Sequence, residues 1–88
     1  MRTAWTAVLA GLAAIALPAW AGEFNDHCAY GLAGFDMLVE TDCSVNWKDP
    51  RTGKTYCFSS RDSKDKFLKD PEANVRKAAA AFDKLNKE

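Results

Sequence analysis

The stretch CSVNWKDPRTGKTYCFS, residues 43–59, decides the fold of this chain because it predicts a β-hairpin. Residues 43–48 alternate between apolar and polar side chains, which is typical of a half-buried strand. Residues 49–53, DPRTG, combine a proline and a glycine at the spacing of a tight turn. Residues 55–59 are β-branched, aromatic or small, and we interpret them as the returning strand.

Two helices are expected after the hairpin. A serine at 59 or 60 can cap a helix that runs to about Lys69. Asp70 and Pro71 then match the N-cap and first position of a second helix. Its apolar stripe follows helical spacing and comprises Val75, Ala78, Ala79, Phe82 and Leu85. The fold class is therefore α+β, with a short hairpin sheet packed against two C-terminal helices.

The segment that precedes the hairpin carries weaker signals. Residues 22–30 have no clear period and are expected to form an extended or looped entry. Gly31 and Gly34 bracket an expected turn. Residues 35–40 (FDMLVE) are compatible with a strand, although their periodicity also allows a helix. Asp26, Asp42 and Asp49 are interpreted as loop and turn residues.

Residues 1–21 resemble a secretory signal peptide in their organisation. Arg2 is followed by an apolar run from Trp5 to Leu17 and by the triplet Ala19-Trp20-Ala21. We expect cleavage after Ala21, a single domain over residues 22–88, and a periplasmic or secreted protein with no membrane span after cleavage. The 12 basic and 12 acidic residues balance, so the chain has no charge signature for nucleic acid. No catalytic constellation is recognisable, and we expect no enzyme.

Two motifs resemble the YHS domain family. Gly53-Lys54-Thr55-Tyr56-Cys57-Phe58-Ser59-Ser60, followed by Phe67-Leu68-Lys69-Asp70-Pro71-Glu72, is similar to its G-K-x-Y-x-F-C-S and F-L-x-x-P-E elements. Residues 26–31 (DHCAYG) resemble its opening C-G-M element more loosely. The resemblance covers about residues 26–74 and implies a treble-clef-like unit of a kind found in heavy-metal transport and sensing proteins.

The chain also departs from that family. Metal-binding members have cysteine where this chain has Ser59, and again near Ser63. The hairpin thiol appears instead at Cys57, two residues earlier. Only Cys28 is carried over as a ligand position, so Cys43 and Cys57 must be argued from their own chemistry.

The three cysteines allow two chemistries within one chain, and pairing between chains is a third alternative. In the first, Cys28, Cys43 and Cys57 ligate a metal, with His27 or Met37 as a fourth group. Three thiolates with an imidazole suit Zn²⁺, and softer sets suit Cu(I). The metal-ligating alternative predicts an exported protein that captures or carries copper or another soft ion. Its partner would be a periplasmic or membrane protein of metal transport or redox chemistry. No Cys-x₂-Cys pair supports this alternative by spacing.

In the second chemistry, an oxidising compartment favours a structural disulfide. Cys43 lies almost opposite Cys57 or Ser59 across the hairpin, and a Cys43–Cys57 bridge would stabilise the domain by about 3 kcal/mol. The sulfurs of Cys43 and Cys57 point to the same face of the hairpin only if Tyr56 and Phe58 occupy the other face of the strand. The chain would then be a disulfide-stapled, non-enzymatic interaction domain that binds a larger partner without metal. The sequence leaves both hypotheses open.

Overall fold

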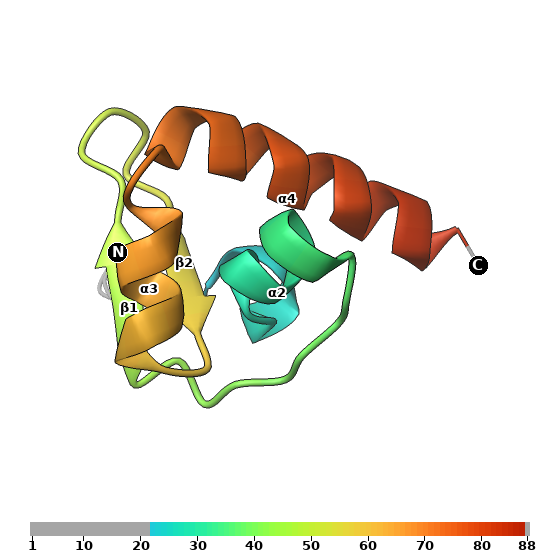
Figure 1. The fold of residues 1–88 in the computed structure, drawn as a ribbon, viewed down its shortest axis with the longest axis horizontal. Coiled ribbons are helices and arrows are strands. Elements are labelled where there is room, and N and C mark those ends of the chain that lie inside the picture. The colour runs from blue at the N-terminus through green and yellow to red at the C-terminus, as the bar shows by residue number, and fades with distance from the viewer. Residues whose placement is uncertain (1–21, 88) are drawn as a thin grey trace, which may run out of the picture.

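The computed structural model describes residues 22–87, and the predicted signal peptide lies outside them. Figure 1 shows a short hairpin at one end of the molecule and a long C-terminal helix that extends away from it. The elements in chain order are a 3₁₀ helix η1 (Glu23–Asp26), α2 (Ala29–Phe35), β1 (Val45–Lys48), β2 (Thr55–Phe58), α3 (Arg61–Phe67) and α4 (Pro71–Asn86). The fold is the expected small α+β unit, with the hairpin packed against C-terminal helical structure.

The predicted hairpin is confirmed. β1 and β2 pair antiparallel, and Trp47 is the register partner of Tyr56. The turn between them depends on Asp49, whose buried carboxylate accepts the Arg51 N–H at 2.9 Å and whose carbonyl accepts the Gly53 N–H at 2.8 Å. Gly53 adopts φ +77°, a left-handed conformation that favours glycine. The turn chemistry in the sequence therefore sets the register.

Both helix starts after the hairpin are confirmed. The Ser60 side chain accepts the Ser63 N–H at 3.1 Å, and α3 ends at Phe67, two residues before the predicted end. Asp70 caps α4, and Pro71 is its first residue. The predicted apolar stripe of α4 is confirmed at four of its five positions, because Val75, Ala78, Phe82 and Leu85 are buried or half-buried. The fifth position differs. Ala79 is exposed, and Ala81 is buried in its place.

The segment before the hairpin differs from the prediction. The predicted turn around Gly31 and Gly34 is wrong, because both glycines lie within α2. Gly31 allows a close approach: a Cβ on it would lie 3.1 Å from Val39 Cγ2. Residues 35–40 form no strand, since α2 ends at Phe35 and Asp36 turns the chain with φ +54°. Two isolated bridges involve the segment before the hairpin, an antiparallel one from His27 to Glu40 and a parallel one from Cys28 to Cys57.

The core lies between the hairpin and the helices. Phe67 is fully buried, and its ring contacts the rings of Phe58 and Tyr56 at centroid distances of 5.2 and 6.0 Å. α4 packs on α2, where buried Ala78 and Ala81 permit close contact. The helix that contacts both strands of the hairpin is α3. Within residues 22–87, no helix is long and apolar enough to span a bilayer.

Candidate metal and thiol site

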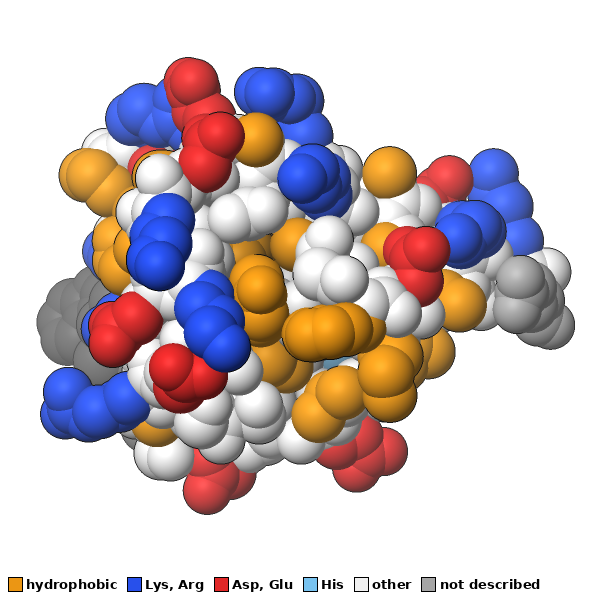
Figure 2. All heavy atoms as spheres, viewed as in Figure 1, with side chains coloured by type: hydrophobic (Ala, Val, Ile, Leu, Met, Phe, Trp, Pro, Cys, Tyr) orange, Lys and Arg blue, Asp and Glu red, His pale blue; other side chains and the backbone are white. Residues whose placement is uncertain are grey.

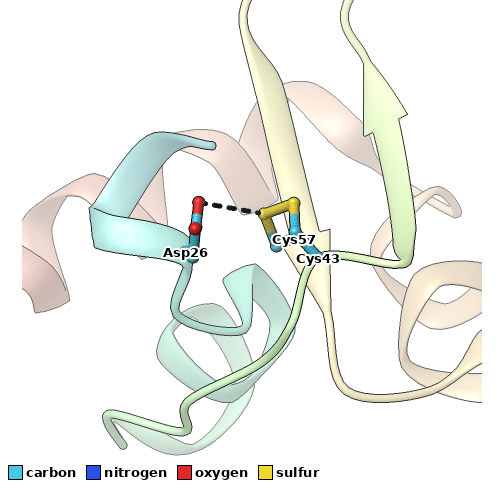
Figure 3. Close-up of side chains that lie close together, drawn as sticks. All are labelled: Asp26, Cys43 and Cys57. Atoms are coloured by element: carbon cyan, nitrogen blue, oxygen red, sulfur yellow. Dashed lines mark hydrogen bonds between the residues drawn. A yellow bond between two sulfur atoms is a disulfide. The ribbon is translucent and has the colours of Figure 1, made fainter. Parts of the chain in front are cut away.

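Cys43 and Cys57 form a disulfide, with their Cα atoms 4.7 Å apart (Figure 3). Tyr56 and Phe58 face the aromatic core, so Cys57 occupies the other face of β2, as the disulfide hypothesis required. The register partner of Cys57 is Asn46, not Cys43. Cys43 lies outside β1 at φ +62°, and this left-handed turn brings its sulfur to Cys57.

The local fold holds Cys43 in this unusual conformation. Its N–H donates to Thr41 Oγ1 at 3.0 Å, and its carbonyl accepts Asn46 Nδ2–H at 2.8 Å. The Thr41 hydroxyl in turn donates to the carbonyl of Asp26 at 2.7 Å. The loop that carries Cys43 is therefore tied to the end of η1.

Asp26 is the third member of this site. Its Oδ1 lies 3.6 Å from Cys57 Sγ, the approach marked in Figure 3. A disulfide sulfur carries no proton, so this is a contact in the oxidised form and becomes a hydrogen bond only if Cys57 is a thiol. One ligand atom each from Asp26, Cys43 and Cys57 lies within 4.8 Å of the other two. We call these three residues the sulfur–carboxylate group.

The Cys28 sulfur is not part of this group, although the Cys28 backbone forms a parallel bridge with Cys57. Cys28 is buried and unpaired, and its Sγ accepts the N–H of Gly31 at 3.4 Å and of Ser59 at 3.3 Å. It thus caps α2 and ties that helix to the end of β2. Ser59 Oγ lies 3.6 Å from the same sulfur, so a hydroxyl stands beside Cys28.

The two remaining predicted ligands also lie elsewhere. His27 Nδ1 is 2.8 Å from the carbonyl of Phe24, and Met37 is 54% exposed in the loop after α2. Of the predicted metal ligands Cys28, Cys43, Cys57 and His27, the structure brings together Cys43 and Cys57 and adds Asp26. Sequence reasoning missed Asp26 because a single aspartate in a loop carries no spacing signal. Its φ of +62° is decided by the tertiary fold.

This arrangement can do two things chemically. In the oxidised form the sulfur atoms are bonded to each other and offer no thiolate to an ion. After two-electron reduction, two thiolates and a carboxylate would point to one place, which is the start of a metal site. The burial of both sulfurs, with Cys57 fully covered and Cys43 nearly so, limits the access of a reductant.

An exposed apolar segment lies away from the sulfur–carboxylate group in sequence. Phe35, Met37 and Leu38 are 62%, 54% and 44% exposed, at the end of α2 and in the loop that follows. Figure 2 shows hydrophobic side chains gathered on one face of the molecule, beside a surface of mixed charge. Large exposed apolar patches on proteins are typical of contact surfaces.

Comparison of the chain with known protein families, with curated proteins and with solved structures gave no match.

Proposed function

We propose that this chain is an exported, non-catalytic metal-binding protein that captures one ion with the reduced Cys43–Cys57 pair. The observation that carries the proposal is the convergence of two sulfurs and the Asp26 carboxylate within 4.8 Å. Thiolates are the ligands that soft and borderline ions such as Cu(I) and Zn²⁺ prefer. Capture and release of the ion, not turnover of a substrate, would be the function.

The redox chemistry of capture balances with an external dithiol. A periplasmic protein of the thiol–disulfide exchange class would reduce Cys43–Cys57 to two thiols and become oxidised to its own disulfide. Binding of the ion would then release the two thiol protons. A disulfide-bearing protein of the same exchange class would take up two electrons from the Cys43 and Cys57 thiolates, re-form their disulfide and release the ion, so the redox state would control loading.

The test is a titration of the reduced chain over residues 22–88. A phosphine reductant is used without oxygen, and Cu(I) or Zn²⁺ is titrated against a coloured chelator. We expect one equivalent to bind to the reduced chain and none to the oxidised chain or to the Cys43→Ala/Cys57→Ala variant. Cys28→Ser is the matched control and should retain binding, because its sulfur faces Gly31 and Ser59. Equal binding by the double variant would refute the proposal.

A second candidate function follows from the disulfide itself. The oxidised domain would act as a stapled interaction module, and its exposed segment Phe35–Leu38 would contact a larger partner. The redox state in the cell separates the two candidates. Acid-trapped, alkylated protein with one labelled thiol, a mass two hydrogens lower and no bound ion would favour the interaction module. Three labelled thiols and an ion that co-purifies under native conditions would favour metal capture.

A further inference from the structure

Gly22, the residue that would follow the predicted cleavage site, lies directly against the sulfur–carboxylate group. Its backbone nitrogen donates to Asp26 Oδ1 at 2.7 Å. A Cβ on Gly22 would overlap Cys57 Sγ and lie 2.9 Å from Asp26 Oδ1 and 3.3 Å from Cys43 Sγ. The φ of Gly22 is −96°, so glycine is needed here for space and not for backbone conformation. Residue 22 therefore occupies a position next to all three members of the group.

Cleavage after Ala21 would change the chemistry of this nitrogen. In the uncleaved chain it is an amide, whose lone pair is delocalised into the carbonyl and does not bind a metal without deprotonation. In the processed chain it is a primary amine, which is a nitrogen ligand once it has lost its proton. Removal of the leader would thus create a donor atom within hydrogen-bond distance of Asp26 Oδ1.

We infer that the processed chain binds Zn²⁺ through four donors: the Gly22 α-amine, the Asp26 carboxylate and the thiolates of Cys43 and Cys57. This inference rests on the proposed function and names its ion and its fourth ligand. It makes tight Zn²⁺ binding depend on removal of the leader, because the precursor lacks the amine. The four-donor site would therefore be complete only after export.

The composition of this donor set favours Zn²⁺ over Cu(I). Zn²⁺ takes sulfur, nitrogen and oxygen ligands in a tetrahedron, whereas Cu(I) selects soft sulfur donors. A tetrahedral zinc with ordinary bond lengths holds its sulfur and oxygen ligand atoms roughly 3.5 Å apart. Asp26 Oδ1 and Cys57 Sγ are 3.6 Å apart. To bind one zinc ion, the sulfurs must separate to about 3.8 Å, which reduction of the disulfide permits. Gly22 N and Asp26 Oδ1 must also move from 2.7 Å to about 3.3 Å apart.

The binding step balances in atoms and charge. The reductant of the thiol–disulfide exchange class first supplies two electrons and two protons to the disulfide. Zn²⁺ then displaces the two thiol protons and one proton from the α-ammonium group. The resulting site holds one divalent ion, two thiolates, one carboxylate and one neutral amine.

The experiment compares three reduced chains that differ only at the N-terminus. One begins at Gly22, the second is the same chain with its α-amine acetylated, and the third retains Ala21. Zn²⁺ affinity is measured for each by competition with a coloured chelator. We expect the chain that begins at Gly22 to bind one equivalent of Zn²⁺ about 10- to 100-fold more tightly than the other two chains. Loss of an outer-shell partner of a metal ligand alone weakens metal binding by that factor.

Two variants within the group test the other ligand positions. Asp26→Asn should weaken Zn²⁺ binding in the chain that begins at Gly22. Gly22→Ala keeps the free amine but adds the Cβ that overlaps Cys57 Sγ, and it should also weaken binding. Circular dichroism of each apo-chain verifies that it is folded before titration.

The outcomes separate this inference from the proposed function. Equal Zn²⁺ affinity in the free and acetylated chains, with loss in the Cys43→Ala/Cys57→Ala variant, would overturn the amine ligand and leave the thiolate site standing. Tighter binding of Cu(I) than of Zn²⁺ by the free chain, unaffected by acetylation, would overturn both the ion and the amine. Failure of every chain to bind either ion would remove the proposed function as well.

Discussion

The two faces of β2 are held in different ways. On one face, Cys57 is bonded to Cys43 and lies against Asp26. On the other face, Tyr56 and Phe58 pack on Phe67, with the ring of Trp47 also in contact with Tyr56. The first face depends on a covalent bond that a reductant can break. The second depends on apolar burial, which is insensitive to redox conditions.

This difference shows how a small domain can contain a redox-responsive site. A domain of this size gains rarely more than about 3–5 kcal/mol from its core, so each face contributes a large share of the stability. The aromatic face must hold the hairpin in place when the disulfide opens. The function that we propose for the reduced form requires this, and the following predictions test it.

The largest effect is expected for Phe67→Ala, which empties the centre of the aromatic face. Phe67 is fully buried, and truncation of such a residue costs about 3–5 kcal/mol. The free energy of unfolding, measured with urea and far-ultraviolet circular dichroism, should fall to near zero. Phe35→Ala is the matched control, because Phe35 is 62% exposed. A similar stability for both variants would contradict the central position of Phe67.

The next effect is expected from the covalent face. The Cys43→Ala/Cys57→Ala variant should lose about 3 kcal/mol in the chain-entropy description of disulfides. The same urea experiment with a reductant should lower the stability of the natural chain by a comparable amount and leave the double variant unchanged. A reductant effect that persists in the double variant would mean that the disulfide is not its target.

A smaller effect is expected for Cys28, which lies beside β2 but belongs to neither face. Cys28→Ala removes the acceptor of the Gly31 and Ser59 N–H groups and should cost about 1–2 kcal/mol. Cys28→Ser keeps an acceptor and should cost less. In the folded natural chain a maleimide should label Cys28 slowly, since the thiol is buried, and quickly after unfolding in urea. Rapid labelling without urea would contradict this burial.

The smallest effect concerns the pH dependence of the aromatic face. Burial raises the pKa of Tyr56 above its usual value of 10.0. The unfolded chain therefore loses the Tyr56 proton at lower pH than the folded chain, and stability falls as the pH rises above about 10. Unfolding measured between pH 9 and 11 should show a steeper decline in the natural chain than in Tyr56→Phe. Parallel declines would mean that Tyr56 ionises equally in both states.

Much of the second half of the chain was predictable because its signals are local. Asp49 and Gly53 specify the turn, and Ser60, Asp70 and Pro71 specify helix starts through their own backbone preferences and hydrogen bonds. The first half of the chain was harder to predict from its sequence. α2 contains two glycines and is capped by a thiol, and neither feature is a usual helix signal.

The candidate site could be predicted only in part. Cys43 and Cys57 were recognised as a possible pair, but the choice between disulfide and three-thiolate site stayed open. Side-chain alternation put Cys43 on the face of Trp47 if the strand began at residue 43. The left-handed φ of Cys43 breaks that alternation. Asp26 and Gly22 join the sulfurs through contacts between segments far apart in the chain.

The sequence by itself determined the hairpin, its turn and the beginnings of α3 and α4, because these depend on interactions between residues a few positions apart. Only the tertiary structure decided that Cys28 caps a helix, that Cys43 meets Cys57, and that the residue after the predicted cleavage site lies against them. Those outcomes depend on how η1 and the loop before β1 close over β2. No local preference of the chain encodes that closure, which follows from the packing of the whole domain.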